Sequence, residues 1–281
     1  MIKVLRPGLQ SSIQDLGRFH YRKYGVPMSG TMDAISAGLA NGLLNNDENA
    51  AVIEITLSGP KLEFTVSTTA VITGAEMSPV LNNLPISNYK VFKVEPGDIL
   101  SFGKLIKGAR CYLAVKGGFQ SPKVLGSRSF YKGITQQERF VKQDIIAFNT
   151  NKNNNLLNKG VVNNKQQFYE TENIKVTKGP ELELFTLKEQ QDILSRIHTI
   201  SNKSNRMGYR LNEQLVPHDF TIITSPVLPG TIQIVPSGHL IILMKDGQTT
   251  GGYPRIFQLT EKSIAILAQK KSGDQFKFIL E

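Results

Sequence analysis

The fold is decided by residues 51–74, which read AVIEITLSGPKLEFTVSTTAVITG. Three short runs rich in β-branched residues lie in this stretch, and turn-forming residues follow two of them, at Gly59-Pro60 and at Gly74. The middle run, residues 62–66, alternates apolar and polar side chains, which is typical of a strand with one buried face. Short strands joined by tight turns favour barrels or sandwiches. We therefore predict a mainly β protein.

The same kind of pattern recurs along the rest of the chain. Further strands are predicted over residues 99–102, 110–115, 230–236 and 240–244. Two short helices are expected, one capped by Thr31 or Asp33 and one that begins at Thr186, where Glu189 completes a capping box. The apolar residues expected on the buried faces of these helices are Ile35, Leu39 and Leu43 in the first, and Leu187, Leu194 and Ile197 in the second.

An asparagine-rich segment divides the chain. Residues 151–164 contain seven asparagines in fourteen positions, too little apolar surface to form a core. We therefore expect an N-terminal β domain with one helix over residues 1–150, a linker or insertion over 151–168, and a C-terminal β-barrel domain over 169–281.

Two short sequence echoes relate the halves of the chain. Residues 58–64 resemble 178–185, and residues 96–102 resemble 272–278. Two copies of one β unit would produce both echoes, and so would the chance recurrence of Gly-Pro and Gly-Asp turns. The sequence leaves both explanations open.

The excess of basic residues does not indicate nucleic-acid binding. The formal net charge is +10, but the lysines are scattered and form only one adjacent pair, Lys270 and Lys271. No aromatic–basic signature of an RNA-binding module appears. A basic surface suits an anionic small molecule or an acidic protein partner.

The remaining bulk features favour a cytoplasmic protein. The single cysteine, Cys111, lies in the strand predicted over residues 110–115 and is expected in the core. One unpaired thiol fits a reducing compartment. Residues 1–8 have no apolar core of a secretory signal, and no apolar stretch is long enough to cross a bilayer. We therefore expect no membrane partner.

The common motifs of self-sufficient enzymes are missing. The sequence has no Gly-rich phosphate loop, no GxGxxG fingerprint and no GxSxG elbow. The four histidines show no metal-ligand spacing, so no metal site is expected. No Met-Lys-Met sequence occurs, so we expect no biotin on this chain.

A polar loop after an apolar run is the main candidate for chemistry. Residues 240–244 are continuously apolar, and residues 245–254 read KDGQTTGGYP. A carboxylate, an ammonium group, an amide and two hydroxyls are thus carried at the end of a buried strand. The alternative is a hairpin shaped by its glycines, with its polar residues in water. Local chemistry alone favours this alternative.

Two other clusters carry charge or polar groups. Residues 204–211 contain Arg206 and Arg210, which suit a carboxylate or phosphate, or else a nearby acidic side chain. Ser29 and Asp33 flank the start of the first predicted helix, where free amides favour anions. Plain helix capping explains Asp33 without any ligand.

Taken in order, these clusters resemble one protein family. The chain is similar to the family known as allophanate hydrolase subunit 2, KipA, biotin-dependent carboxyltransferase or the C subunit of 5-oxoprolinase. The segments that carry the resemblance are residues 14–18 (QDLGR), 25–33 (GVPMSGTMD), 204–211 (SNRMGYRL), 230–233 (GTIQ) and 246–254 (DGQTTGGYP). The sequence departs from the family at Gly247, where arginine is common, and over residues 133–139, where glutamines replace glycines.

The resemblance implies two cyclophilin-like β-barrel units with a few short helices. It also makes the polar loop the leading site. We expect Asp246, Arg206 and Lys245 to be catalytic, with Asp246 orienting or deprotonating an amide and Arg206 binding a carboxylate or phosphoryl group. The residues expected to bind substrate are Gln233, Gln248, Thr249, Thr250, Gly251, Gly252, Asn205 and Ser29.

The resemblance also implies a reaction and partners. The expected function is that of one component of ATP-dependent 5-oxoprolinase, a hydrolase that converts 5-oxoproline, ATP and water into L-glutamate, ADP and phosphate. The partners would be a KipI-like B subunit together with a LamB/YcsF-like A subunit, and ATP with Mg would be used by the complex. The alternatives are the carboxyltransferase component of a biotin-dependent urea or amide carboxylase, and a KipA-type regulator that binds a kinase inhibitor.

Overall fold

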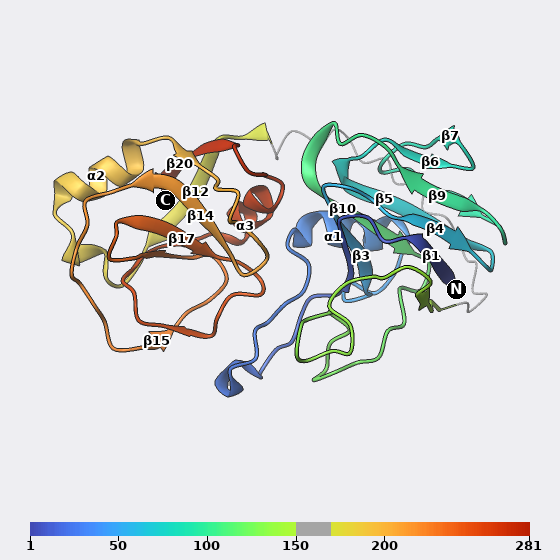
Figure 1. Ribbon diagram of the computed structural model, residues 1–281, viewed down its shortest axis with the longest axis horizontal. Helices are drawn as coiled ribbons and strands as arrows, with labels where there is room; N and C mark the ends of the chain where they lie inside the picture. The colour runs from blue at the N-terminus through green and yellow to red at the C-terminus, as the bar shows by residue number, and fades with distance from the viewer. Residues whose placement is uncertain (150–169) are drawn as a thin grey trace. The chain divides into compact units, whose positions relative to one another are not determined.

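A computed structural model describes residues 1–149 and 170–281 of the chain, and the linker predicted over 151–168 lies outside these residues. The chain divides into two compact units (Figure 1). The first contains Met1–Arg18 and Ser29–Lys165, and the second contains Phe19–Met28 and Gln166–Glu281. The short segment Phe19–Met28 therefore groups with the C-terminal part of the chain, although it lies near the N-terminus in sequence.

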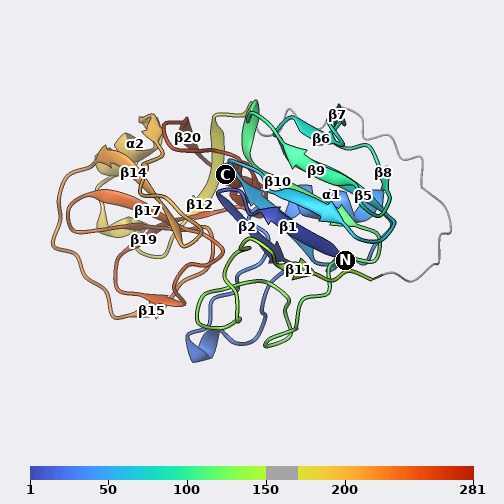
Figure 2. The same ribbon diagram turned by 45° about the vertical axis from the view of Figure 1, so that its right-hand side comes forward.

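The first unit contains two antiparallel sheets. The six-stranded sheet has the order β11-β1-β4-β9-β6-β7, and the five-stranded sheet has the order β2-β3-β10-β5-β8. Figure 2 labels most of the strands of both sheets. Its elements are β1 (Ile2–Arg6), β2 (Gln10–Gln14), α1 (Ala34–Leu43), β3 (Val52–Thr56), β4 (Lys61–Phe64), β5 (Thr68–Glu76), β6 (Pro79–Leu81), β7 (Leu84–Pro85), β8 (Phe92–Val94), β9 (Ile99–Phe102), β10 (Lys107–Val115) and β11 (Ile145–Ile146).

The five-stranded sheet is buried on both faces, because β10 alternates its side chains between two cores. Cys111 and Leu113 join the apolar cluster that both sheets share, whereas Tyr112 and Ala114 face helix α1. The predicted burial of Cys111 is confirmed, and burial raises the pKa of its thiol.

Helix α1 begins where the sequence predicted, and of its expected buried face Leu43 is buried but Ile35 is not. Asp33 caps it by accepting a hydrogen bond from the Ser36 amide. Ile35, expected in the core, is 42% exposed, and the helix packs on the sheet through Ala37 and Ala40. Small side chains allow the helix backbone to approach β5 and β10 closely, so the large residue turns outward.

The second unit is built on one seven-stranded sheet of order β13-β20-β12-β19-β16-β17-β14, with a two-stranded ladder of β15 and β18 beside it. Its elements are η1 (Arg22–Tyr24), β12 (Asn173–Lys178), η3 (Leu182–Leu184), α2 (Leu187–Ser195), β13 (His198–Thr199), β14 (Gly208–Gln214), β15 (Ser225–Pro226), β16 (Thr231–Ile234), β17 (His239–Leu243), β18 (Thr250–Gly251), β19 (Arg255–Leu259), α3 (Glu261–Ala268) and β20 (Gln275–Leu280).

The seven-stranded sheet curls into a nearly closed barrel. The outermost strands, β13 and β14, are joined by an antiparallel bridge between Ile200 and Leu211. The amide of Ser201 also donates to the carbonyl of Arg210 at 2.9 Å. Closure removes the open sheet edges that would otherwise leave unpaired backbone groups. The predicted mainly β class with a few short helices is confirmed.

The helices of the second unit show what local sequence predicts well and what it does not. The capping box of Thr186 and Glu189 is present at the start of α2. Its expected buried face is wrong, because Leu187 is 76% exposed and Ile197 is also exposed, whereas Ile193 is buried. Helix α3 was not expected. Its N-cap, Thr260, accepts a hydrogen bond from the Ser263 amide, and threonine is a common capping residue that could have indicated this helix.

The two sequence echoes have different structural outcomes. Asp98 and Asp274 each accept a hydrogen bond from the amide three residues earlier, and each follows a glycine with positive φ. A strand follows both turns. The Gly-Pro echo leads instead to strand β4 in the first unit and to the 3-10 helix η3 in the second. The Gly-Asp echo therefore marks a shared turn, and the Gly-Pro echo does not.

No helix among residues 1–149 and 170–281 is long and apolar enough to cross a membrane.

The buried histidine of the second unit makes folding depend on pH. His198 bonds to the carbonyl of Ile193 at 2.8 Å, and its ring packs on Phe276 and Phe278. Burial lowers the pKa of His198 despite this bond. The folded protein therefore binds a proton at His198 less readily than the unfolded chain does. The contribution of the neutral His198 ring to stability is complete above about pH 6.5, and it is lost as the pH falls toward the lower pKa of the folded state.

We expect the free energy of unfolding, measured by urea titration, to fall between pH 7 and pH 5. His198 contributes at most about 1.4 kcal/mol per pH unit to the slope. The His198→Gln variant should show a shallower slope. Part of the slope that remains in this variant comes from His218, because burial lowers its pKa as well. An unchanged slope in this variant would contradict the assignment.

Candidate active site

The backbone places Arg206 next to Asp246. Strand β14 pairs antiparallel with β17, with Gly208 opposite Leu243. The pairing continues beyond both strands, because the Met244 amide donates to the Met207 carbonyl at 3.0 Å and the Asp246 amide donates to the Arg206 carbonyl at 2.9 Å. The start of β14 and the end of β17 therefore carry these two charged residues on adjacent chains.

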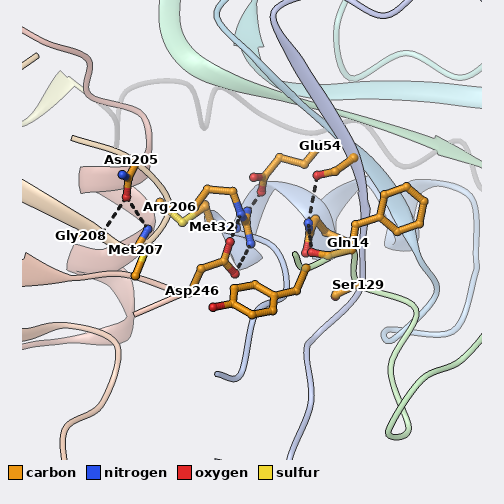
Figure 3. Close-up of polar contacts among 12 residues, drawn as sticks. Gln14, Met32, Glu54, Ser129, Asn205, Arg206, Met207, Gly208 and Asp246 are labelled. Atoms are coloured by element: carbon orange, nitrogen blue, oxygen red, sulfur yellow. Dashed lines mark hydrogen bonds and ion pairs between the residues drawn. The ribbon is translucent and has the colours of Figure 1, made fainter. Parts of the chain in front are cut away.

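Their side chains form a buried ion pair with two hydrogen bonds (Figure 3). Arg206 Nε donates to Asp246 Oδ2 at 2.7 Å, and Arg206 Nη2 donates to Oδ1 at 3.1 Å. The side chains are only 7% and 10% exposed, so little water screens the attraction. The guanidinium thus binds both carboxylate oxygens, and each oxygen keeps a second lone pair that can accept a further hydrogen bond.

Asn205 shapes the turn that presents Arg206. Its side-chain oxygen accepts hydrogen bonds from the amides of Met207 at 2.8 Å and Gly208 at 3.3 Å (Figure 3). The amide of Asn205 donates back to the Gly208 carbonyl. Its side-chain oxygen is thus engaged in the turn, which leaves its side-chain NH₂ group for the predicted role in substrate binding.

Lys245 and Gly247 flank the aspartate. The buried ammonium group of Lys245 lies 3.9 Å from Oε2 of Glu261, whose side chain is 84% exposed. A β-carbon at Gly247 would lie 2.9 Å from the Met244 carbonyl oxygen and 3.0 Å from that of Met207. The turn therefore leaves no room for a side chain at Gly247, one of the positions at which the sequence departs from the family that it resembles.

Two carboxamide groups converge on Gly251. A β-carbon at Gly251 would lie 2.6 Å from Gln233 Nε2 and 2.8 Å from Gln248 Nε2. Gln233 is buried and donates to the Tyr253 carbonyl at 3.1 Å. The carboxamide groups of Gln233 and Gln248 therefore pack where a side chain of residue 251 would lie, so this position requires glycine. The structure brings these three predicted site residues together.

The other predicted residues of this loop are held by a short ladder. Thr250 and Gly251 form β18, which pairs with β15. The carbonyl of Thr249 accepts hydrogen bonds from the Val227 amide and from Arg22, which was not among the predicted site residues. Gly252 lies beside this ladder, and its carbonyl accepts a hydrogen bond from the Ile222 amide.

Ser29 is the one predicted site residue in the first unit. It is fully buried, adopts a positive φ of 55°, and its hydroxyl has no hydrogen-bond partner among the described residues. A β-carbon at the following Gly30 would lie 2.9 Å from the Leu16 carbonyl oxygen, so this turn packs directly on the chain after β2.

Two buried carboxylates fix the segments around Ser29. Asp15 accepts hydrogen bonds from the hydroxyls of Ser127 and Ser129, both at 2.6 Å, and from the amides of Gly17 and Arg128. Glu54 accepts bonds from the Met32 amide at 2.7 Å and from the Tyr112 hydroxyl at 3.0 Å (Figure 3 shows the Met32 contact).

Burial raises the pKa of Tyr112 well above its ordinary value, and the charges of Glu54 and Asp33 add to the effect. The hydroxyl therefore stays protonated and donates to Glu54, while it accepts from the Asp33 amide at 2.8 Å. Within residues 1–149 and 170–281, no group of three or more His, Cys, Asp or Glu side chains is arranged to hold a metal ion.

The fold and these motifs define a class of protein. The chain belongs to the carboxyltransferase domain family, subdomains A and B, which matches residues 24–280. The family resemblance seen in the sequence is thereby confirmed.

The relatives are of two kinds. The chain is 33% identical to the C subunit of 5-oxoprolinase from Escherichia coli (strain K12), over 99% of this chain and 91% of that protein. It is 31% identical to the urea amidolyase of Saccharomyces cerevisiae, over 99% of this chain but 16% of that protein. The crystal structure of TTHA0988 matches with a TM-score of 0.88 at 26% identity. The match covers 99% of this chain but only 55% of the TTHA0988 chain.

The ion pair gives a stability prediction. We expect Arg206→Met and Asp246→Leu each to lower the free energy of unfolding by about 3–5 kcal/mol, because each removes one partner of a buried, hydrogen-bonded ion pair. The double variant should lose much less than the sum, since both charges of the pair are then removed.

The exposed pair of Asp192 and Arg196 is the matched control, with an N–O distance of 2.6 Å and side chains 40% and 38% exposed. Its coupling energy should be about 0.3–0.5 kcal/mol. A double-mutant cycle by urea denaturation measures both pairs, and equal coupling energies would show that burial of the Arg206–Asp246 pair has no energetic consequence.

Proposed function

We propose that this chain is one component of an ATP-dependent 5-oxoprolinase, which opens the lactam ring of 5-oxoproline to give L-glutamate. The observation that carries the proposal is the nearly full-length similarity to the C subunit of 5-oxoprolinase, which covers 91% of the E. coli protein. A relative that matches over both chains' lengths is better support for shared function than one that matches a small part of a larger protein.

The loop after β17 is the proposed reaction site. A lactam presents an N–H donor and a carbonyl acceptor in one plane, next to a carboxylate in 5-oxoproline. Asp246 would orient or deprotonate the N–H through an oxygen lone pair that the ion pair with Arg206 does not use. The guanidinium would then attract the substrate carboxylate or a transferring phosphoryl group, and Lys245 adds positive charge. Gln233, Gln248 and Thr250 would fix the substrate's orientation by hydrogen bonds.

The ATP-dependent step requires other subunits in this proposal. The sequence contains no Gly-rich phosphate loop, so ATP with Mg would be used by the complex. The expected partners are a KipI-like protein and a LamB/YcsF-like protein. The name of the E. coli relative, which makes it one lettered component of 5-oxoprolinase, supports the presence of further subunits. The proposed site would be active only in that assembly.

A carboxyltransferase is the second candidate. The chain is 31% identical to the yeast urea amidolyase over 99% of its own length, which favours transfer of a carboxyl group to urea or a related amide. The carboxyl donor would be carried by another chain or domain, because no Met-Lys-Met sequence is present. Carboxylation of urea by the purified chain with a carboxylated biotin carrier, together with no 5-oxoproline turnover in the reconstituted complex, would establish this alternative.

We expect Asp246→Asn to reduce ATP-coupled 5-oxoproline turnover in the reconstituted complex by at least about 100-fold, because an amide cannot accept the substrate proton. Glutamate formation and phosphate release are measured together. The substitution keeps the size of the side chain, and a circular dichroism spectrum like that of the wild type is required to show that the variant is folded.

Asp219→Asn provides the control, because Asp219 is an exposed aspartate of the same unit. This variant should keep wild-type turnover. Full turnover by a folded Asp246→Asn variant would refute the role of Asp246.

A further inference from the structure

The segment Phe19–Met28 brings an arginine to the proposed site loop. Arg22 opens the short helix η1, which ends at Tyr24. Gly25 caps it, and its positive φ of 77° lets its amide donate back to the Arg22 carbonyl. The Nη2 group of Arg22 donates to the carbonyl of Val227 and, at 3.4 Å, to the carbonyl of Thr249. One guanidinium therefore binds two backbone segments that lie more than 200 residues along the chain.

The two carbonyls lie at one end of the ladder formed by β15 and β18. Ser225 is opposite Gly251, Pro226 is opposite Thr250, and the Val227 amide donates to the Thr249 carbonyl at 3.0 Å. A ladder of two residues per strand has little stability of its own. Arg22 supplies hydrogen bonds at this end, and Arg255 supplies another by donating to the Pro226 carbonyl at 2.9 Å.

The position of β18 determines how Gly251 meets the two carboxamides. Gln233 extends from β16, inside the barrel sheet, whereas Gly251 depends on the short ladder for its place. The packing of both glutamine amides on Gly251 leaves less than 3 Å for any added atom, so a small shift of β18 would change this arrangement.

We infer that Arg22 is a positioning residue, which holds Thr249, Thr250 and Gly251 in register with Gln233 and Gln248 for substrate binding. The inference rests on the proposed function of this loop. Arg22 acts through backbone carbonyls, because its Nη2 group has two N–H donors and each can bind one of them. Partial burial lowers the pKa of Arg22, but the guanidinium remains charged at neutral pH.

The test compares Arg22→Met, Arg22→Lys and Lys23→Met. Lys23 is the matched control, because it lies in the same helix and its ammonium group sits 5.0 Å over the ring of Tyr24. The substitution to methionine removes the same charge at both positions. Amide hydrogen exchange of the full chain reports on residues 225–227 and 249–252, and steady-state kinetics of the reconstituted complex report on 5-oxoproline.

We expect Arg22→Met to speed exchange of these amides by at least about tenfold and to raise KM for 5-oxoproline about tenfold with kcat within about threefold, because ground-state binding is weakened. Arg22→Lys should restore part of both effects. Lys23→Met should match the wild type in both measurements.

Exchange and kinetics that are the same in Arg22→Met and Lys23→Met would overturn the inference. Faster exchange with unchanged kinetics for 5-oxoproline would instead show that Arg22 positions the loop and that the loop does not bind this substrate. That outcome would refute the proposed function of the site.

Discussion

The buried ion pair between Arg206 and Asp246 is the interaction on which the candidate site depends. Two charges that are nearly excluded from water are costly unless each satisfies the other, so the pair restricts how the start of β14 and the end of β17 can be arranged. The backbone bonds that continue the strand pairing hold the two residues at the required distance. The loop that follows Asp246 therefore starts from a fixed point.

The rest of that loop is held by contacts from distant parts of the chain. Gln233 comes from β16, and Arg22 comes from a segment near the N-terminus. Gly247 and Gly251 leave room for carbonyl oxygens and carboxamides that a side chain would displace. The polar loop is consequently a packed structure, unlike the solvated hairpin that local chemistry favoured.

The same principle applies in the first unit, where buried carboxylates organise backbone amides and hydroxyls. Asp15 connects the end of β2 to residues 127–129, and Glu54 connects β3 to the residue before the cap of α1. Arg18, which is close to Asp15 in sequence, donates to the Ser129 carbonyl. Arg18 is thus bound by a residue more than 100 positions away in sequence, although Asp15 is a charged residue only three positions away.

From the sequence alone one can predict the caps of α1 and α2, the motifs of the family and part of the strands, namely β3, β4, β5, β9, β10, β16 and β17. These features depend on alternation, turn residues and side chains within a few positions of each other. The buried faces of the helices, the place of Phe19–Met28 in the second unit and the bond between Arg206 and Asp246 follow from the tertiary packing instead. Those outcomes depend on packing and on partners separated by 40 to more than 200 residues, and no local pattern encodes such distances.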